Sequence, residues 1–304
     1  MMQRFFFCAA FCCAAIFLLL GLFSYNIQDS RADSPSSKSK HLLRYRFQKG
    51  DVLRWNVLQS LKIRTSVSGV EEVVETTSRS TKVWTVLHVD HAGTATFEYC
   101  VDDVNMRQFQ TDKDGAKIAE YNSRKDKNIP GAFINLDGTI GIPLAHISID
   151  VLGKTTKKPL RIYSGSTSTE NRIVIPLPQE PVAVGDSWSV SIPVEIGQPN
   201  GTVKKINARQ EFTLFDVRSG IAVIKFATKI LTPLTPKEES QILDKFSSGK
   251  MELDLDAGHF IRQETTIDKR VIGFQGTGDN IHYLARLTEC CCGLNSCELC
   301  SPKN

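Results

Sequence analysis

Alternation of apolar and polar residues constrains this chain more than any other feature of its sequence. From Leu53 to Val67 nearly every second residue is apolar, and mostly polar residues lie between them. A period of two is typical of a β-strand with one buried face, whereas a helix needs a period near 3.6. Further strands are expected at Val73 to Val89, Thr94 to Met106, Thr202 to Asp216 and Ile221 to Ile230, with a final hairpin from Lys250 to Phe274. The pattern therefore predicts a mostly β protein with antiparallel strands.

Turn signals separate these segments and indicate two related halves. Asn200–Gly201 is the pair typical of a tight hairpin turn. A second pattern occurs twice, since Gly50–Asp51 precedes Trp55 and Gly185–Asp186 precedes Trp188. One kind of turn leading into a strand thus recurs, which suggests a duplicated unit.

One helix is expected between Thr235 and Phe246, because Thr235 can cap its start, Pro236 suits its first turn and Gly249 follows its end. The prediction is a mostly β fold of two antiparallel curved-sheet, half-barrel-like halves with one or two short helices. Its expected parts are a signal peptide or N-terminal membrane anchor in 1–32, a linker in 33–40, a first half in 41–160, a second half in 161–288 and a Cys-rich tail in 289–304.

The first residues have the features of an export signal. Arg4 precedes an uncharged, apolar stretch from Phe5 to Phe23, and Ser30–Ala32 places small residues where a signal peptidase needs them. We therefore expect cleavage before Asp33. The alternative is an uncleaved membrane tether through residues 5–23, because that stretch is nearly as long as a spanning helix. Both interpretations place the remainder outside the cytoplasm, in a periplasmic, envelope-associated or extracellular location.

Five of the nine cysteines lie close together near the C-terminus. Cys297 and Cys300 have the spacing at which two thiolates share a metal ion, so this group is a weak candidate for a metal or redox site: Cys290, Cys291, Cys292, Cys297 and Cys300. Outside the cytoplasm, unprotected thiols oxidise to disulfides. Disulfides are therefore the favoured interpretation, with Cys100 as a sixth candidate, and an unpaired or partner-linked tail stays open.

Three smaller groups are better explained by structure than by chemistry. His88, Asp90 and His91 lie in a turn, and a metal corner is the alternative. Glu252, Asp254 and Asp256 lie along a strand with one solvated face, and a cation site is the alternative. Trp55, Trp84 and Trp188 lie in apolar strand patterns, and an aromatic platform is the alternative. The sequence contains no recognised catalytic motif, so we expect no enzymatic activity and no cofactor, and no catalytic residue is nominated.

Three segments resemble a family of exported bacterial proteins of uncharacterised function. They are Tyr45 to Trp55, Leu177 to Trp188 and Gly249 to Thr265, within a likeness that covers about residues 41–288. The resemblance implies paired curved antiparallel sheets similar to the half-barrels of lipoprotein carriers. The Cys-rich tail lies outside it, and the middle segment looks shortened.

These features lead to an expected function. A net charge of +4, without basic runs interleaved with aromatic residues, excludes nucleic acid as a partner. We expect an exported, non-enzymatic envelope protein that binds a hydrophobic ligand or an envelope protein through its curved sheets. The alternatives are a membrane-tethered structural or surface-interaction protein and a metal or redox protein that acts through the cysteine cluster. The ligand-binding residues are unknown at this stage.

Overall fold

The computed structural model describes residues 39–112, 115–162, 174–198 and 200–292, which belong to one compact unit. Strands dominate this part of the chain, as the alternating pattern predicts. The strands are β1 (Lys40–His41), β2 (Val52–Val67), β3 (Val70–Val89), β4 (Ala95–Asp112), β5 (Gly115–Asn122), β6 (Ala145–Ile149), β7 (Leu160–Arg161), β8 (Val182–Ala183), β9 (Ser187–Gly197), β10 (Val203–Arg218), β11 (Ile221–Ile230), β12 (Ser247–Asp254), β13 (His259–Ile272) and β14 (Asn280–Cys292). The helical turns are α1 (Ile134–Asp137), α2 (Pro236–Glu239), η1 (Gly131–Phe133) and η2 (Leu243–Lys245).

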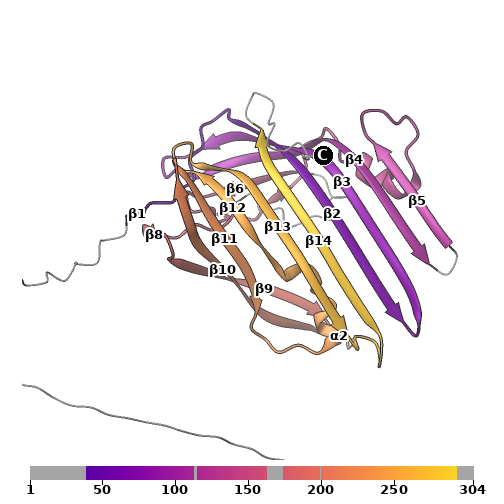
Figure 1. Cartoon of the computed structure of the whole chain (residues 1–304). Helices are drawn as coiled ribbons and strands as arrows, with labels where there is room; N and C mark the ends of the chain where they lie inside the picture. Colours follow the sequence, from indigo (N-terminus) through magenta and orange to yellow (C-terminus); the bar gives the residue numbers. More distant parts are fainter. Residues whose placement is uncertain (1–38, 113–114, 163–173, 199, 293–304) are drawn as a thin grey trace, which may run out of the picture. The chain divides into compact units, whose positions relative to one another are not determined.

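Twelve of these strands form one antiparallel sheet, and β1 and β8 form a separate pair (Figure 1). The order in the large sheet is β7-β6-β4-β3-β2-β14-β13-β12-β11-β10-β9, and β5 also pairs with β4. The predicted mostly β fold with two antiparallel halves is confirmed. The halves join where β14 pairs with β2, from Asn280 opposite Ser66 to Cys292 opposite Arg54. Strand β14, the last of the described strands, was not predicted and lies at the centre of the sheet.

The sheet curves around a core on one of its faces, which we call the inner face and which carries Trp55 and Val57. Strands β6 and β9 are nine positions apart in the strand order, about 40 Å if the sheet were flat. The consecutive residues Pro176 and Leu177 nevertheless contact both regions. Leu177 N donates to Leu152 O just after β6, and Pro176 O accepts from Trp188 Nε1 in β9. The sheet is therefore curved. The shared core is formed by almost fully buried side chains of both halves: Leu43, Tyr45, Val86, Phe97, Phe212, Leu214, Ile224, Met251 and Leu253.

Two segments, residues 42–47 and 174–178, cover this core. Tyr45 N donates to Val151 O at 2.9 Å, and Arg46 N donates to Gly258 O at 2.8 Å, so the first segment contacts a turn of each half. The buried Tyr45 hydroxyl donates to Ile175 O at 3.1 Å, which connects the two segments. Hydrogen bonds from both segments thus hold the first and second halves together.

The repeated turn recurs in the structure with matching hydrogen bonds. Gly50 N donates to Val86 O and Val86 N donates to Asp51 O, both at 2.9 Å. The second copy forms the same pair of bonds, from Gly185 N to Leu214 O and from Leu214 N to Asp186 O. Both glycines have a positive φ, +93° and +98°, which other residues rarely adopt.

The tryptophans near these turns are not equivalent. Leu53 lies three residues after Gly50 and pairs with Trp84, while Trp188 lies three residues after Gly185 and pairs with Phe212. Trp188 therefore corresponds to Leu53, and Trp55 enters its strand two residues later. The turns therefore recur as the sequence pattern suggests, and the two tryptophans occupy different positions after them.

The predicted helix is much shorter than expected. Thr235 does cap α2, because its side chain accepts from Glu238 N while the Glu238 carboxylate accepts from Thr235 N. The helix ends at Glu239, since Ile242 and Leu243 are buried in two separate core clusters and β12 already begins at Ser247. Core packing thus prevails over helix propensity. Among the described residues, no helix is long and apolar enough to cross a bilayer.

Candidate functional site

A cavity of about 920 Å³, which we call the turn-end cavity, opens where turns of the two halves meet. Its walls come from the segment that leads into β2, from the turns after β3 and β6, and from the turn between β12 and β13. The lining residues are Tyr45, Arg46, Phe47, Gln48, Gly50, Asp51, Val52, Leu53, Gly93, Val151, Asp256, Ala257 and His259. The cavity has the size of a small-molecule site, for which about 300–1,000 Å³ is usual.

The apolar part of this lining rests on the core. Phe47 lies edge-on to the buried Phe97, with ring centroids 4.8 Å apart, and its ring is stacked with Tyr45 at 6.0 Å. Burial raises the pKa of Tyr45, so its hydroxyl stays protonated and keeps donating to Ile175 O. The aromatic wall is therefore rigid and uncharged at neutral pH.

Hydrogen bonds also fix the turn on the opposite wall. The Arg46 guanidinium donates to the main-chain oxygens of Leu255 and, at 2.8 Å, of Asp256. Gly258 has a φ of +72°, and a Cβ there would lie 2.6 Å from the Arg46 Cβ. Only glycine suits this close approach between the β12–β13 turn and residues 45–48. Such preformed walls lower the cost of ordering when a ligand binds.

Polar groups at the cavity provide hydrogen-bonding capacity. The Asp51 carboxylate already accepts from Gln48 N at 2.7 Å and so stabilises its own turn. The imidazole of His259 is half-buried, with Nδ1 3.2 Å from Phe260 O. Within the described ranges no group of three or more potential metal ligands occurs. The arrangement suits an uncharged or amphiphilic molecule that places its apolar part on the aromatic wall and its polar end toward these groups.

The predicted cysteine site is only partly described. Cys297 and Cys300 lie outside the described residues, as does the side chain of Cys292. Cys290 is disulfide-bonded and buried, and Cys291 on the next position packs against the inner-face core. The predicted tail thus begins as part of β14, while its disulfide connectivity stays a prediction.

Cys100 lies on β4 as a free thiol, and its Sγ is 3.7 Å from an Asp102 carboxylate oxygen. Three strand spacings separate Cys100 from the cysteines of β14, because β3 and β2 lie between. That is about 14 Å, too far for a disulfide between Cys100 and Cys290. Burial and then the Asp102 carboxylate raise the pKa of the Cys100 thiol to about 11.

The smaller groups are explained by structure, as expected. The Asp90 carboxylate accepts from Thr94 N and Ala92 N, which lowers its pKa and stabilises the turn between the exposed His88 and His91. Trp55 and Trp84 are buried in the core, where their rings lie 4.2 Å from Phe260 and 4.3 Å from Tyr99.

The acidic group is also divided between structural roles. The Asp254 side chain accepts from the main-chain N–H groups of Asp256 and Ala257 and so shapes the turn. Glu252 lies opposite Arg262 on the neighbouring strand. These carboxylates therefore do not converge on one point.

Sequence analysis did not find the turn-end cavity, because its residues come from four turns that are far apart in the chain. The available signals were the Gly–Asp turn at Gly50–Asp51 and the glycine at position 258, both of which the sequence patterns contain. Neither pattern indicates that these turns lie side by side in the folded protein.

Comparison with known proteins gave little. No family model and no curated protein matches the chain, so the resemblance to exported bacterial proteins stays a prediction. One solved structure, titled "Lipid-protein interactions in lipovitellin", is similar at 11% identity with a TM-score of 0.47. The match covers 82% of this chain and 26% of that chain. A likeness of this size says nothing about the ligand of this protein.

Proposed function

We propose that this chain is an exported, non-enzymatic binding protein that holds a small amphiphilic or hydrophobic ligand in its turn-end cavity. The observation that carries the proposal is the cavity itself, about 920 Å³ with a fixed aromatic wall and polar groups beside it. Export is proposed from the N-terminal sequence, which favours a location in the periplasm, at the envelope or outside the cell. N-terminal sequencing of the exported protein decides between release and a tether, since cleavage predicts a chain that starts at Asp33.

The apolar part of the ligand would lie on Phe47, Leu53 and Val151. Val52 also lines the cavity and is 51% exposed. A ligand that covers these side chains removes their apolar surface from water, which contributes about 25 cal/mol per Å². His259 and Gln48 are placed to hydrogen-bond its polar end.

The test is binding of the uncharged fluorescent probe N-phenyl-1-naphthylamine to the exported protein. Val52→Glu places a charge in the lining of the cavity and should weaken binding about tenfold, equivalent to about 1.4 kcal/mol. Val70→Glu is the matched control, because Val70 is also 51% exposed but lies at the far end of β2 in the β2–β3 hairpin. The control should bind like the wild type.

A second variant fills the cavity without adding charge. Leu53→Trp introduces the residue that the equivalent position Trp188 already has, so the fold should accept it. Probe binding should again weaken. Equal affinity in all four proteins, or no binding by the wild type, would contradict a ligand site in this cavity.

A further inference from the structure

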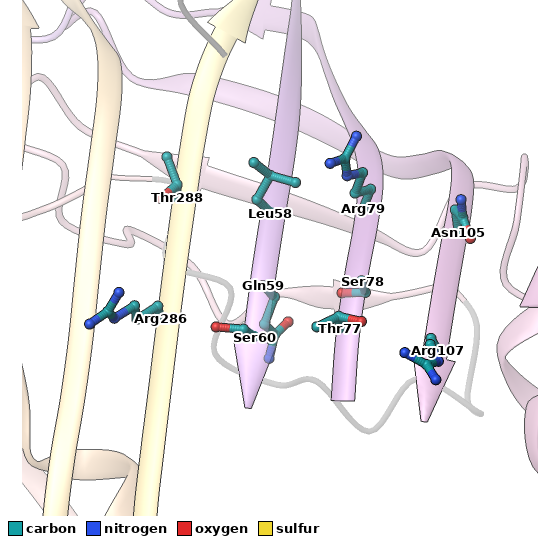
Figure 2. Close-up of a pocket in the computed structure, with 10 residues that line it drawn as sticks. All are labelled: Leu58, Gln59, Ser60, Thr77, Ser78, Arg79, Asn105, Arg107, Arg286 and Thr288. Carbon is teal, nitrogen blue, oxygen red and sulfur yellow. The ribbon is translucent and has the colours of Figure 1, made fainter. Parts of the chain in front are cut away.

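The outer face of the sheet, opposite the core, has a second cavity of about 470 Å³ across the four central strands β14, β2, β3 and β4. Figure 2 shows its lining, with Arg286 on one side of β2 and Arg79 and Arg107 on the other. Strand pairing fixes this arrangement, because Arg286 lies opposite Ser60, and Arg79 lies opposite Leu58. Side chains that lie opposite each other in a sheet point to the same face.

The lining of this arginine pocket contains three cations and no carboxylate. The remaining lining residues are neutral: Leu58, Gln59, Ser60, Thr77, Ser78, Asn105 and Thr288. Of these, Ser60, Thr77, Asn105 and Thr288 share the face of the arginines and carry hydroxyl or amide groups, while Gln59 and Ser78 alternate to the other face. Arg107 has an ion pair with Glu120 at 3.0 Å, and both side chains are well exposed. Within the part of the chain that the structure describes, Arg79 and Arg286 form no ion pair.

Other cations close by on the same face do have carboxylate partners among the described residues, unlike Arg79 and Arg286. Arg54 pairs with Asp102, Lys62 with Glu75, and Arg124 with Asp103. The carboxylates nearest to Arg79 and Arg286 on this face contact other cations. Asp103, diagonal to Arg79, pairs with Arg124. Glu264 and Asp268, which flank the position opposite Arg286 on β13, contact Arg262 and Lys250, and His282, respectively. The pocket keeps a net positive charge in a concave surface, which raises the local concentration of anions.

We propose that the arginine pocket binds a ligand with more than one phosphate or sulfate group. Guanidinium groups form paired, charge-assisted hydrogen bonds with such oxyanions, and the hydroxyl and amide groups between them supply further donors. The three guanidinium groups stand apart in Figure 2, so a ligand with several anionic groups can contact more of them than a single phosphate can. This inference is independent of the turn-end cavity on the other side of the molecule's central strands.

The experiment measures binding of sodium tripolyphosphate and of inorganic phosphate to the exported protein by calorimetry at physiological salt. Tripolyphosphate should bind more tightly than phosphate, and Arg79→Gln/Arg286→Gln should weaken its binding at least about tenfold. The matched control is Arg64→Gln/Arg270→Gln. It removes the same charge from the same face at two exposed arginines that flank β14 and do not line the pocket.

The control arginines lie about 13 Å or more along the strands from Ser60, beyond the screening length of about 8 Å. The control should therefore bind tripolyphosphate within about twofold of the wild type. An equal loss of affinity in both double variants would show that binding depends only on the overall charge of this face, and it would overturn the proposal. A wild type that binds neither tripolyphosphate nor anionic vesicles would also overturn it. Unchanged thermal unfolding of the variants shows that they fold.

A vesicle arm separates a soluble polyanion from a lipid headgroup. Phosphatidylcholine vesicles with and without phosphatidylinositol 4,5-bisphosphate, whose headgroup carries several phosphates, are sedimented with the wild type and both double variants. Sedimentation that depends on this lipid and on Arg79 and Arg286 supports the pocket and identifies a headgroup as the source. Binding of tripolyphosphate without sedimentation supports it with a soluble ligand.

Discussion

A partly buried ion pair on the inner face allows a quantitative test of the packing between the halves. Lys82 of β3 and Glu289 of β14 lie on either side of β2, with Nζ 2.7 Å from Oε1 and side chains 17% and 12% exposed. Their neighbours on β2 are the buried Trp55, opposite Lys82, and Val57, opposite Glu289. The pair therefore crosses a strand inside a mostly apolar surface and connects the first half to the last strand.

Removal of one partner should be costly. Lys82→Met leaves the Glu289 carboxylate in a poorly hydrated place without a cation, which typically costs about 3–5 kcal/mol. The remaining 12% exposure favours the lower end of that range. Lys82→Met/Glu289→Leu removes both charges and fills the space with apolar groups, so its free energy of unfolding should return to within about 1 kcal/mol of the wild type.

The assay is urea unfolding followed by tryptophan fluorescence and circular dichroism. Lys62→Met serves as control, because the Lys62–Glu75 pair is 34% and 42% exposed and should lose less than about 1 kcal/mol. The reasoning is refuted if Lys82→Met costs no more than Lys62→Met, or if the double variant is no more stable than Lys82→Met alone.

Two further predictions follow from close contacts. A Cβ on Gly249 would lie 1.9 Å from Glu264 O, so Gly249→Ala should lower the free energy of unfolding by more than about 2 kcal/mol. A Cβ on Gly197 would have no atom within 4 Å, so Gly197→Ala is the control and should change this free energy by less than about 1 kcal/mol. Both variants are measured by urea unfolding. Similar midpoints for both would contradict the contact. The pKa of Cys100 is raised to about 11, so less of the reactive thiolate is present and iodoacetamide should alkylate Cys100 more slowly at about pH 8 in the native protein than in the unfolded one. Asp102→Asn should accelerate the reaction of the native protein. Alkylation is measured on the Cys100 peptide by mass spectrometry. Equal native rates would show that Asp102 has no such effect.

The strands with one buried face could be predicted from the sequence, because alternation reports burial directly. The predicted Ile221 to Ile230 coincides with β11, and Leu53 to Val67 with all but the first residue of β2. The same signal exists in β14, where Ile281, Tyr283, Ala285 and Leu287 recur at two-residue spacing, but Leu284 interrupts the alternation. What alternation cannot reveal is the pairing partner, since β14 lies beside β2 at the other end of the described chain.

The two cavities could not be predicted for a related reason. The turn-end cavity depends on which turns meet after the sheet has curved, and the arginine pocket depends on the register of four strands. Arg79 and Arg286 become neighbours across β2 only through the pairing of β14 with β2. Single residues gave no signal, because an exposed arginine in a strand is ordinary until its neighbours are known.

The internal repeat explains why the turn-end cavity lies where it does. The Gly–Asp turn recurs in both copies because its glycine has a positive φ and its aspartate carboxylate accepts from the main-chain N–H three residues earlier, that of Gln48 or of Ala183. The third residue after the glycine is apolar in both copies. In the second copy this residue is Trp188, whose ring stacks on Phe212 at 5.6 Å and whose Nε1 donates to Pro176 O. In the first copy it is the smaller Leu53, which lines the cavity. The cavity therefore lies beside the copy with the smaller side chain, and Leu53→Trp tests whether this difference in size provides the space.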